Sequence, residues 1–313
     1  MAMSKAMLAA LKALSYANTE LDVKKNYKLE RQVGNLLHPA IKPLFEFWDH
    51  RVPVGDHDVP VRIFHPKTRE SQELLLFFHG GGWVTGNIDT YTATCASLAD
   101  DTGRRVASVD YRLAPEFPFP CAVEDCYGVA RELFLHSELL EAEPPQITLI
   151  GDSAGGNLAA VVSLLAADRG EFQVENQVLI YPATNNVHDE TSPFPSIREN
   201  GENYLLTSKK ICDYLSLYIQ SPEDFLSPYF APLLAEDLSG QPRTLVITAQ
   251  FDPLRDEGEE YGRRLKAAGC EVELYRFDDM LHGFFTLPLK FGPVRLCHQV
   301  IESFLDRRRD SEK

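Results

Sequence analysis

The sequence predicts an α/β fold, an open and mostly parallel sheet with helices on both faces. Short β-rich apolar runs recur along the chain, each followed by a turn or loop and then by an amphipathic stretch. Several runs are apolar at consecutive rather than alternate positions, as expected for strands of a parallel sheet that is covered on both sides. The 313 residues are enough for one large sheet with a sizeable core, so a second domain is not required.

The expected strands follow one another in a regular order. A leading antiparallel pair is predicted at the amino-terminal end, and six further runs belong to the parallel part of the sheet. A helix is also expected near residues 208–220, between the strands predicted at 177–180 and 244–248. The predicted strands span residues 51–54, 59–64, 74–78, 105–109, 147–150, 177–180, 244–248 and 271–277.

Two segments interrupt this alternation. Residues 1 to about 45 are mixed in charge and helical in character before any strand begins. Residues 183 to about 235 separate two strands and are far longer than a usual loop, so they form either a lid or a disordered segment. Their many aromatic side chains favour an ordered cap. We therefore expect an N-terminal helical cap segment at 1–45 and an α/β domain at 46–313 with a cap insertion at about 183–235.

The charge balance argues against two classes of partner. The chain has 31 Lys and Arg against 46 Asp and Glu, a formal net charge of −15. A field of this sign repels phosphate backbones and anionic lipid, so we expect neither nucleic acid nor membrane as a partner. Hydrophobic residues make up 44% of the chain, which is ordinary for a globular protein and argues against a disordered or fibrous one.

Cysteine use and the amino-terminal sequence both indicate a cytoplasmic protein. The six cysteines form no C-x-x-C pair and no zinc-ligand cluster with histidine, so we expect buried reduced thiols and no metal site. Lys5 and Lys12 leave an apolar run that is too short for a signal peptide. No stretch approaches the ~18 apolar residues of a membrane span.

Ser153 is the candidate nucleophile. It lies in the pattern G-x-S-x-G at residues 151–155, directly after the strand 147–150. The following stretch reads as a helix that ends at Gly170. A strand, a tight turn and a helix are what a nucleophile elbow requires, because the serine takes a strained backbone conformation and small neighbours leave room for it. The helix would also direct its partly positive N-terminus toward the reaction centre.

A glycine run predicts donors for an oxyanion. His79 and three glycines follow the strand 74–78, and this motif is similar to the HGGG motif of lipases and esterases. Backbone amides held about 3 Å from a developing oxyanion stabilise it, and glycines let the backbone come close to a substrate. We assign the donors to the amides of Gly81, Gly82 and Ala154, with Gly80 and Gly81 as the rival pair. His79 is expected to fix the loop.

His282 is the candidate general base. Of the nine histidines, it is the one in the loop directly after the last predicted strand, at the same sheet edge as Ser153; the others lie before the sheet is built, on helices or in the cap. Its acid partner should follow the preceding strand. Asp252 comes after 244–248 and its extension, beyond the carboxyl end of that strand. Asp256 reads better as a helix N-terminal charge. Asp278 and Asp279 could shape the loop of His282.

Five motifs in the same order resemble the hormone-sensitive-lipase-like branch of the α/β hydrolases. They are HGGGW at 79–83, DYRLAPE at 110–116, GDSAGGN at 151–157, DPLRD at 252–256 and HGF at 282–284. The resemblance runs from about residue 50 to the C-terminus. It implies the α/β-hydrolase fold with an eight-stranded sheet, and a cap built from the N-terminal helices and an insertion. The triad order Ser153, Asp252, His282 is that of this superfamily.

The resemblance also implies an activity. Microbial acetyl esterases and carboxylesterases belong to this branch, so the expected function is hydrolysis of small-molecule esters with short acyl chains, from acetyl to about octanoyl, without a cofactor. An amidase or a longer-chain lipase would use the same machinery, and a ligand receptor of the same fold would lack a complete triad. Asp152 is expected to bind nearby loop backbone, and Tyr111 and Arg112 to anchor their turn. A homodimer is possible.

Overall fold

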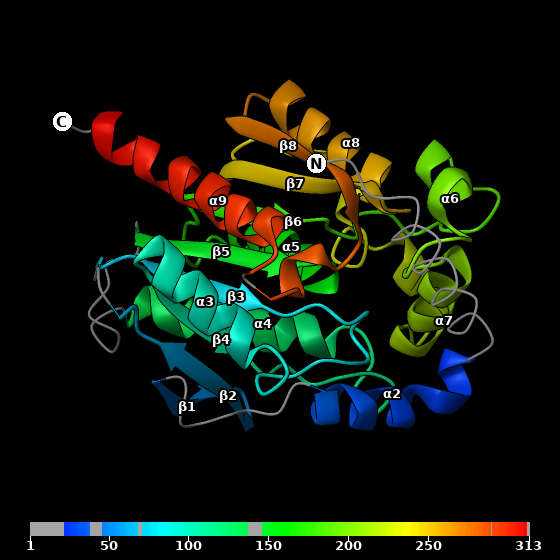
Figure 1. Cartoon of the computed structure of the whole chain (residues 1–313), viewed down its shortest axis with the longest axis horizontal. Helices are drawn as coiled ribbons and strands as arrows, with labels where there is room; N and C mark the ends of the chain where they lie inside the picture. Colours follow the sequence, from blue (N-terminus) through cyan, green and yellow to red (C-terminus); the bar gives the residue numbers. More distant parts are fainter. Residues whose placement is uncertain (1–21, 38–45, 68–70, 137–145, 289, 312–313) are drawn as a thin grey trace.

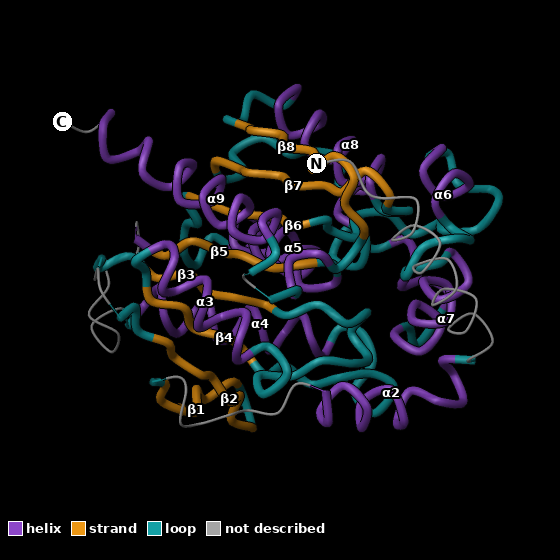
Figure 2. Tube along the Cα trace, viewed as in Figure 1, coloured by secondary structure: helices purple, strands orange, loops and turns teal. Residues whose placement is uncertain are grey.

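One twisted sheet organises the molecule. The computed structural model describes residues 22–37, 46–67, 71–136, 146–288 and 290–311. Eight strands lie in the order β1-β2-β4-β3-β5-β6-β7-β8 (Figures 1 and 2), with β2 antiparallel to both of its neighbours and every other pair parallel. The predicted α/β class and the leading antiparallel pair are confirmed. The strands are β1 (Phe47–Val54), β2 (His57–Phe64), β3 (Leu74–Phe78), β4 (Arg105–Val109), β5 (Ile147–Asp152), β6 (Asn176–Ile180), β7 (Arg243–Phe251) and β8 (Val272–Leu281).

Helices cover both faces of this sheet, which explains the continuous apolar runs. Side chains of β3 point alternately to two separate cores: Leu74, Leu76 and Phe78 to one, Leu75 and Phe77 to the other. The first core is closed by α4 (Cys121–Leu135), α5 (Ala154–Arg169) and α8 (Arg255–Ala267), and the second by α3 (Thr92–Thr102) and α9 (Gly292–Ser311). Because both faces are buried, the central strands show no alternation between apolar and polar residues.

Several strands are longer than their sequence pattern predicts: β1 begins at Phe47, β7 ends at Phe251, and β5 and β8 also continue past their predicted ends. β5 continues to Asp152 and pairs there with Ile180, so the strand runs directly into Ser153. β8 continues past residue 277, where two acidic residues had indicated a loop, and reaches Leu281. Pairing with β7 shifts register between Ala249 and Phe251, and Asp279 takes a positive φ of 60°. A polar stretch can be a strand here because β8 is an edge strand, paired on one side only.

The connection between β6 and β7 is an ordered helical excursion. It contains α6 (Pro195–Asn200), α7 (Ser208–Tyr218) and the short 3-10 helices η4 (Pro222–Leu226) and η5 (Pro232–Leu234). A third short helix, η6 (Phe284–Thr286), follows β8. Buried aromatic side chains attach the excursion to the sheet domain, for example Tyr218, whose ring stacks on Trp83 with centroids 4.6 Å apart. The helix predicted near 208–220 is therefore α7.

Helix α2 (Val23–Leu37) packs beside α7 at the same end of the molecule (Figure 1). It represents the described part of the predicted N-terminal cap segment, whose residues 1–21 and 38–45 lie outside the described residues. The division into 1–45 and 46–313 stays a prediction.

Two smaller expectations concern thiols and membranes. All six cysteines are free, as predicted, but Cys121, Cys212 and Cys270 are only partly buried, so the expectation of full burial is wrong for these three. Within the described ranges, no helix combines the length and apolarity needed to cross a bilayer.

Candidate active site

Ser153 occupies a strained turn between β5 and α5. Its φ and ψ are 56° and −117°, a region that non-glycine residues rarely adopt. Its backbone N–H donates to the carbonyl of Ile180 at 2.8 Å, which fixes the turn to the neighbouring strand. A Cβ on Gly155 would lie 1.9 Å from the carbonyl oxygen of Phe78, and one on Gly151 would lie 2.2 Å from that of Gly155. Both glycines are therefore required for the strand and the helix to pass this closely.

The structure brings the three predicted side chains together. Nε2 of His282 lies 2.9 Å from Oγ of Ser153, and Nδ1 of His282 lies 2.7 Å from Oδ2 of Asp252. A carboxylate only accepts hydrogen bonds, so Nδ1 carries the hydrogen and Nε2 is left to accept the hydrogen of the serine. The Asp252 side chain is fully buried and that of His282 is 12% exposed. This arrangement can deprotonate a serine that attacks an electrophile.

Asp252 is also the best placed of the carboxylates that the sequence left open. Its Oδ1 accepts from the backbone N–H of Leu254 at 2.8 Å, so both carboxylate oxygens are engaged and the group is fixed in orientation. Asp256 instead binds Ser196 and Arg255 at the start of α8, as predicted for a helix N-terminal charge. Asp279 lies in β8, where its N–H donates to Oε1 of Gln250.

The glycine loop after β3 distinguishes between the two proposed donor pairs. The N–H of Gly80 points at Oδ1 of Asp152 (2.8 Å) and the hydroxyl of Tyr91 (3.0 Å), so it is already engaged. Among the described residues, the N–H groups of Gly81, Gly82 and Ala154 have no acceptor. All three residues line one cavity with Ser153 and His282. The structure thus favours Gly81 and Gly82 over Gly80 and Gly81 as available donors.

His79 supports this loop and stays neutral. Its Nδ1 lies 2.8 Å from the carbonyl of Gly80, and its ring stacks on Tyr111 with centroids 4.2 Å apart. Tyr111 in turn donates its hydroxyl hydrogen to the carbonyl of His79 at 2.7 Å. Complete burial lowers the pKa of His79 to about 4, so the ring carries no charge at neutral pH. His79 fixes the loop, as predicted, whereas Tyr111, predicted to anchor its own turn, binds this loop as well.

Asp152 binds the same loop, also as predicted. Besides the N–H of Gly80, its carboxylate accepts from the hydroxyl of Tyr91 at 3.1 Å, and the hydroxyl of Tyr181 lies 3.4 Å away. Burial raises the pKa of Asp152 to about 6, although hydrogen bonds from Tyr91 and Gly80 oppose this. The folded protein therefore retains a proton on Asp152 in a pH range in which the unfolded chain has lost it.

This raised pKa predicts a pH-dependent effect of Asp152→Asn on stability. For a carboxyl whose pKa rises on folding, the stabilising contribution is fully present below the unfolded value of 3.8 and disappears as pH increases through about 6. At roughly 1.4 kcal/mol for each pKa unit, wild type loses on the order of 3 kcal/mol over this range relative to the neutral isostere. Urea unfolding at pH 4, 5, 6 and 7 should show the variant gaining that much relative stability. A constant difference between the two proteins would contradict the prediction.

The cavity beside Ser153 is small and mostly apolar. Its volume is about 220 Å³. The β6–β7 excursion and its neighbours contribute one wall, and the glycine loop with Ser153 and His282 contributes the other. The apolar and aromatic lining residues are Trp83, Tyr91, Ala154, Ala183, Leu205, Leu206, Ile211, Tyr214 and Leu254.

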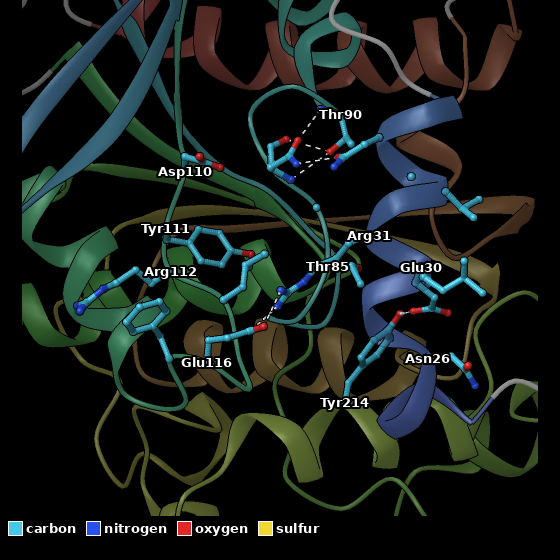
Figure 3. Close-up of a pocket in the computed structure, with 18 of the residues that line it drawn as sticks. Asn26, Glu30, Arg31, Thr85, Thr90, Asp110, Tyr111, Arg112, Glu116 and Tyr214 are labelled. Carbon is cyan, nitrogen blue, oxygen red and sulfur yellow. Dashed lines mark hydrogen bonds and ion pairs between the residues drawn. The ribbon is translucent and has the colours of Figure 1, made fainter.

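A larger cavity, of about 860 Å³, lies between α2 and the segments that follow β3 and β4 (Figure 3). None of the three triad residues lines it, although Lys210 and Tyr214 line both cavities.

Several residues of this site were not identified from the sequence. Tyr91 and Tyr181 hold Asp152, and the ring of Tyr181 lies 4.6 Å from that of His282. Asn157 donates to the carbonyls of Ala183 and Phe230 and so connects α5 to the excursion. Asn157 belongs to the GDSAGGN motif, which offered a signal, whereas no local pattern distinguishes the two tyrosines. In the described part of the chain, no group of three or more His, Cys, Asp or Glu could hold a metal ion.

Comparisons with known proteins find relatives among the hydrolases. A family model described as alpha/beta hydrolase fold matches residues 75–286. The chain is 40% identical over 245 residues to the carboxylic ester hydrolase LipN of Mycobacterium tuberculosis, covering 76% of this chain and 64% of that protein. It is 36% identical to an arylesterase of Saccharolobus solfataricus, covering 83% and 85%. A hyperthermophilic esterase from the archaeon Pyrobaculum calidifontis superposes with a TM-score of 0.84 at 37% identity, over 97% of this chain and 99% of that one.

Proposed function

The chain belongs to the hormone-sensitive-lipase-like branch of the α/β hydrolase fold family and is a carboxylic ester hydrolase. On this basis we propose that it cleaves small esters of short-chain acids with Ser153, His282 and Asp252 as its catalytic triad. The observation that carries this proposal is the hydrogen-bonded series from Ser153 through His282 to Asp252, at 2.9 and 2.7 Å, beside three unengaged amides.

In the first half of the reaction, Oγ of Ser153 attacks the ester carbonyl carbon. Nε2 of His282 takes the proton as the new C–O bond forms, and Asp252 stabilises the resulting imidazolium. The carbonyl oxygen becomes an oxyanion that accepts hydrogen bonds from the amides of Gly81, Gly82 and Ala154. Collapse of this intermediate breaks the bond to the alcohol, which leaves with the proton of His282. The acid remains esterified to Ser153.

The second half repeats these steps with water as the nucleophile. His282 removes a proton from the water as its oxygen attacks the acyl carbon, and the same three amides stabilise the second oxyanion. Returning the proton to Oγ of Ser153 releases the carboxylic acid and restores the free enzyme. The strained backbone of Ser153 supports this role, because it directs the hydroxyl away from both β5 and α5.

The size of the catalytic cavity predicts a preference for short acyl chains. A cavity of about 220 Å³ has room for a short acyl chain but not for one of sixteen carbons. In a p-nitrophenyl ester series from two to sixteen carbons, kcat/KM should therefore be highest between two and eight carbons. It should be at least tenfold lower at sixteen carbons, because the additional methylenes remain in water. Initial rates of p-nitrophenol release provide the measurement.

Three other results, one from this series and two from other probes, would contradict the proposal. Undiminished kcat/KM at sixteen carbons would indicate a long-chain lipase with the same triad. Faster cleavage of p-nitroacetanilide than of p-nitrophenyl acetate would indicate an amidase. A fluorescent phosphonate ester that reacts with serine hydrolases should label the wild-type chain once. A chain that neither reacts with it nor hydrolyses any ester would be a ligand receptor.

A further inference from the structure

Helix α2 is hydrogen-bonded to the loop that carries Gly81 and Gly82. Arg31 on this helix donates from Nε to the carbonyl of Val84 at 2.7 Å and from Nη2 to the carbonyl of Ala114, also at 2.7 Å. Its guanidinium pairs with both oxygens of Glu116, at 3.1 and 2.9 Å (Figure 3). Two backbone carbonyls and one carboxylate thus fix a single arginine, whose side chain is 25% exposed.

The carbonyls that Arg31 binds belong to the backbone around the glycines. Val84 and Thr85 both donate their N–H groups to the carbonyl of Gly81, at 3.1 and 2.9 Å. Ala114 donates its N–H to the carbonyl of Trp83 at 2.9 Å. Since Arg31 holds Val84 and Ala114 together, it fixes the carboxyl end of the short turn in which the peptides of Gly81 and Gly82 lie.

A second contact reaches Gly82 from α7. Gly82 lies against the ring of Tyr214 on α7, so closely that a Cβ there would be 2.5 Å from Cγ and Cδ2 of the tyrosine. The hydroxyl of Tyr214 donates to Oε2 of Glu30 at 2.9 Å, and Nζ of Lys210 lies 2.8 Å from Oε1 of the same carboxylate. Glu30 therefore determines where the ring of Tyr214 rests on Gly82.

These contacts matter because α2 does not pack continuously on the loop. The cavity of about 860 Å³ separates the helix from the segments after β3 and β4 (Figure 3). Polar side chains bridge this space: Glu30, Arg31 and, one turn later, Asn35, which accepts from Nδ2 of Asn87 at 2.9 Å. Hydrogen bonds of fixed geometry thus connect the helix to the loop.

We propose that α2 sets the position of the oxyanion donors, with Arg31 and Glu30 as its positioning residues. Arg31 acts through the carbonyls of Val84 and Ala114, and Glu30 acts through the ring of Tyr214. The inference depends on the proposed function, because it assigns a consequence to amides that bind an oxyanion. Neither residue needs to touch substrate. Their loss should therefore reduce stabilisation of the transition state more than it reduces binding of the substrate in its ground state.

The test combines kinetics with an inhibitor that reports on the oxyanion alone. Ser153 adds across the carbonyl of an alkyl trifluoromethyl ketone, its proton passes to His282, and the negative charge stays on the former ketone oxygen. Affinity for this adduct therefore measures the donors directly. For Arg31→Met we expect kcat and inhibitor affinity to fall together by about tenfold, with KM changed less than twofold. Arg31→Met with Tyr214→Ala, which also removes part of the cavity wall, should lower kcat and inhibitor affinity by about a hundredfold.

Controls separate this role from a general loss of structure. Arg264→Met is matched, since Arg264 also donates to two backbone carbonyls, those of Leu233 and Ala235, but away from the glycine loop. It should lower Tm without changing kcat per site titrated with phosphonate. Tyr214→Phe keeps the ring on Gly82 and should retain more activity than Tyr214→Ala. If Arg31→Met does not fold, Glu30→Ala tests the contact that places the ring of Tyr214, and Asn35→Ala tests the bond from α2 to Asn87.

Three results would overturn the inference: an increase in KM alone, a lower Tm with unchanged kcat, or a kcat loss without loss of inhibitor affinity. Each would leave the proposed function intact, provided that wild type hydrolyses p-nitrophenyl acetate. Absence of that activity in the wild-type chain would instead remove the proposed function.

Discussion

Replacing Ser153 with alanine should lower kcat for p-nitrophenyl acetate by about five to six orders of magnitude. The variant lacks the oxygen that forms the acyl-enzyme, while His282 and Asp252 keep their places and have nothing to activate. Alanine meets the same backbone strain at φ 56° as serine, so the fold should persist. Stopped-flow and steady-state release of p-nitrophenol give the rate, and intact mass after phosphonate treatment should show no adduct.

Ser163→Ala is the matched control for this variant. Ser163 lies in α5, the helix that follows Ser153, and is buried; its hydroxyl donates to the carbonyl of Ala159 or to Oε1 of Gln177 and has no contact with His282. Its loss should cost about 1 kcal/mol of stability and leave kcat within twofold. Retention of ester hydrolysis by Ser153→Ala at more than a thousandth of the wild-type rate would refute the assignment of the nucleophile.

Asp252→Asn should lower kcat by about four orders of magnitude without a comparable change in KM. The N–H of Leu254 would keep the side-chain oxygen of the asparagine as its acceptor, so the amide NH₂ would face Nδ1 of His282. A donor at that position forces the hydrogen of the imidazole onto Nε2, which then cannot accept the proton of Ser153. The same substitution at Asp256, which binds Ser196 and Arg255, should change kcat less than threefold.

The shape of a pH–rate profile would not distinguish Asp252→Asn from Asp256→Asn. The size of the loss in kcat would. If Asp252→Asn lost less activity than Asp256→Asn, another carboxylate would have to orient His282. Asp278→Asn would then be the next variant to measure.

The turn at Ser153 and the strand ends that precede Asp252 and His282 could be predicted from the sequence, because short segments of the chain define them. Gly151 and Gly155 flank Ser153 for a steric reason that any strand–turn–helix elbow imposes, and the structure shows those close contacts. Asp252 and His282 follow consecutive parallel strands, so the topology alone brings them to one edge. The catalytic roles of the three remain proposals, which the variants above test.

Residues whose partners lie far along the chain could not be predicted in this way. The contact of Tyr214 with Gly82 joins an excursion after β6 to a loop after β3, and Arg31 reaches Val84 from a helix before the sheet. No periodicity encodes such pairs, since they depend on how α2 and α7 settle over the strand ends. The end of β8 is predicted too early for a related reason: Asp278 and Asp279 interrupt its apolar pattern, and pairing with β7 decides the conformation beyond them.

The catalytic groups and the wall of the cavity lie in different segments of the chain, so the two can change independently. The reacting groups follow strand ends or lie in the glycine loop, whereas Leu205, Leu206 and Ile211 belong to the excursion between β6 and β7. Chimaeras that exchange this excursion with that of a relative should alter which acids are accepted and preserve the chemistry. Tyr214 is the exception, since it rests on Gly82, so a successful graft has to bring an aromatic ring and its partner on α2 along with it.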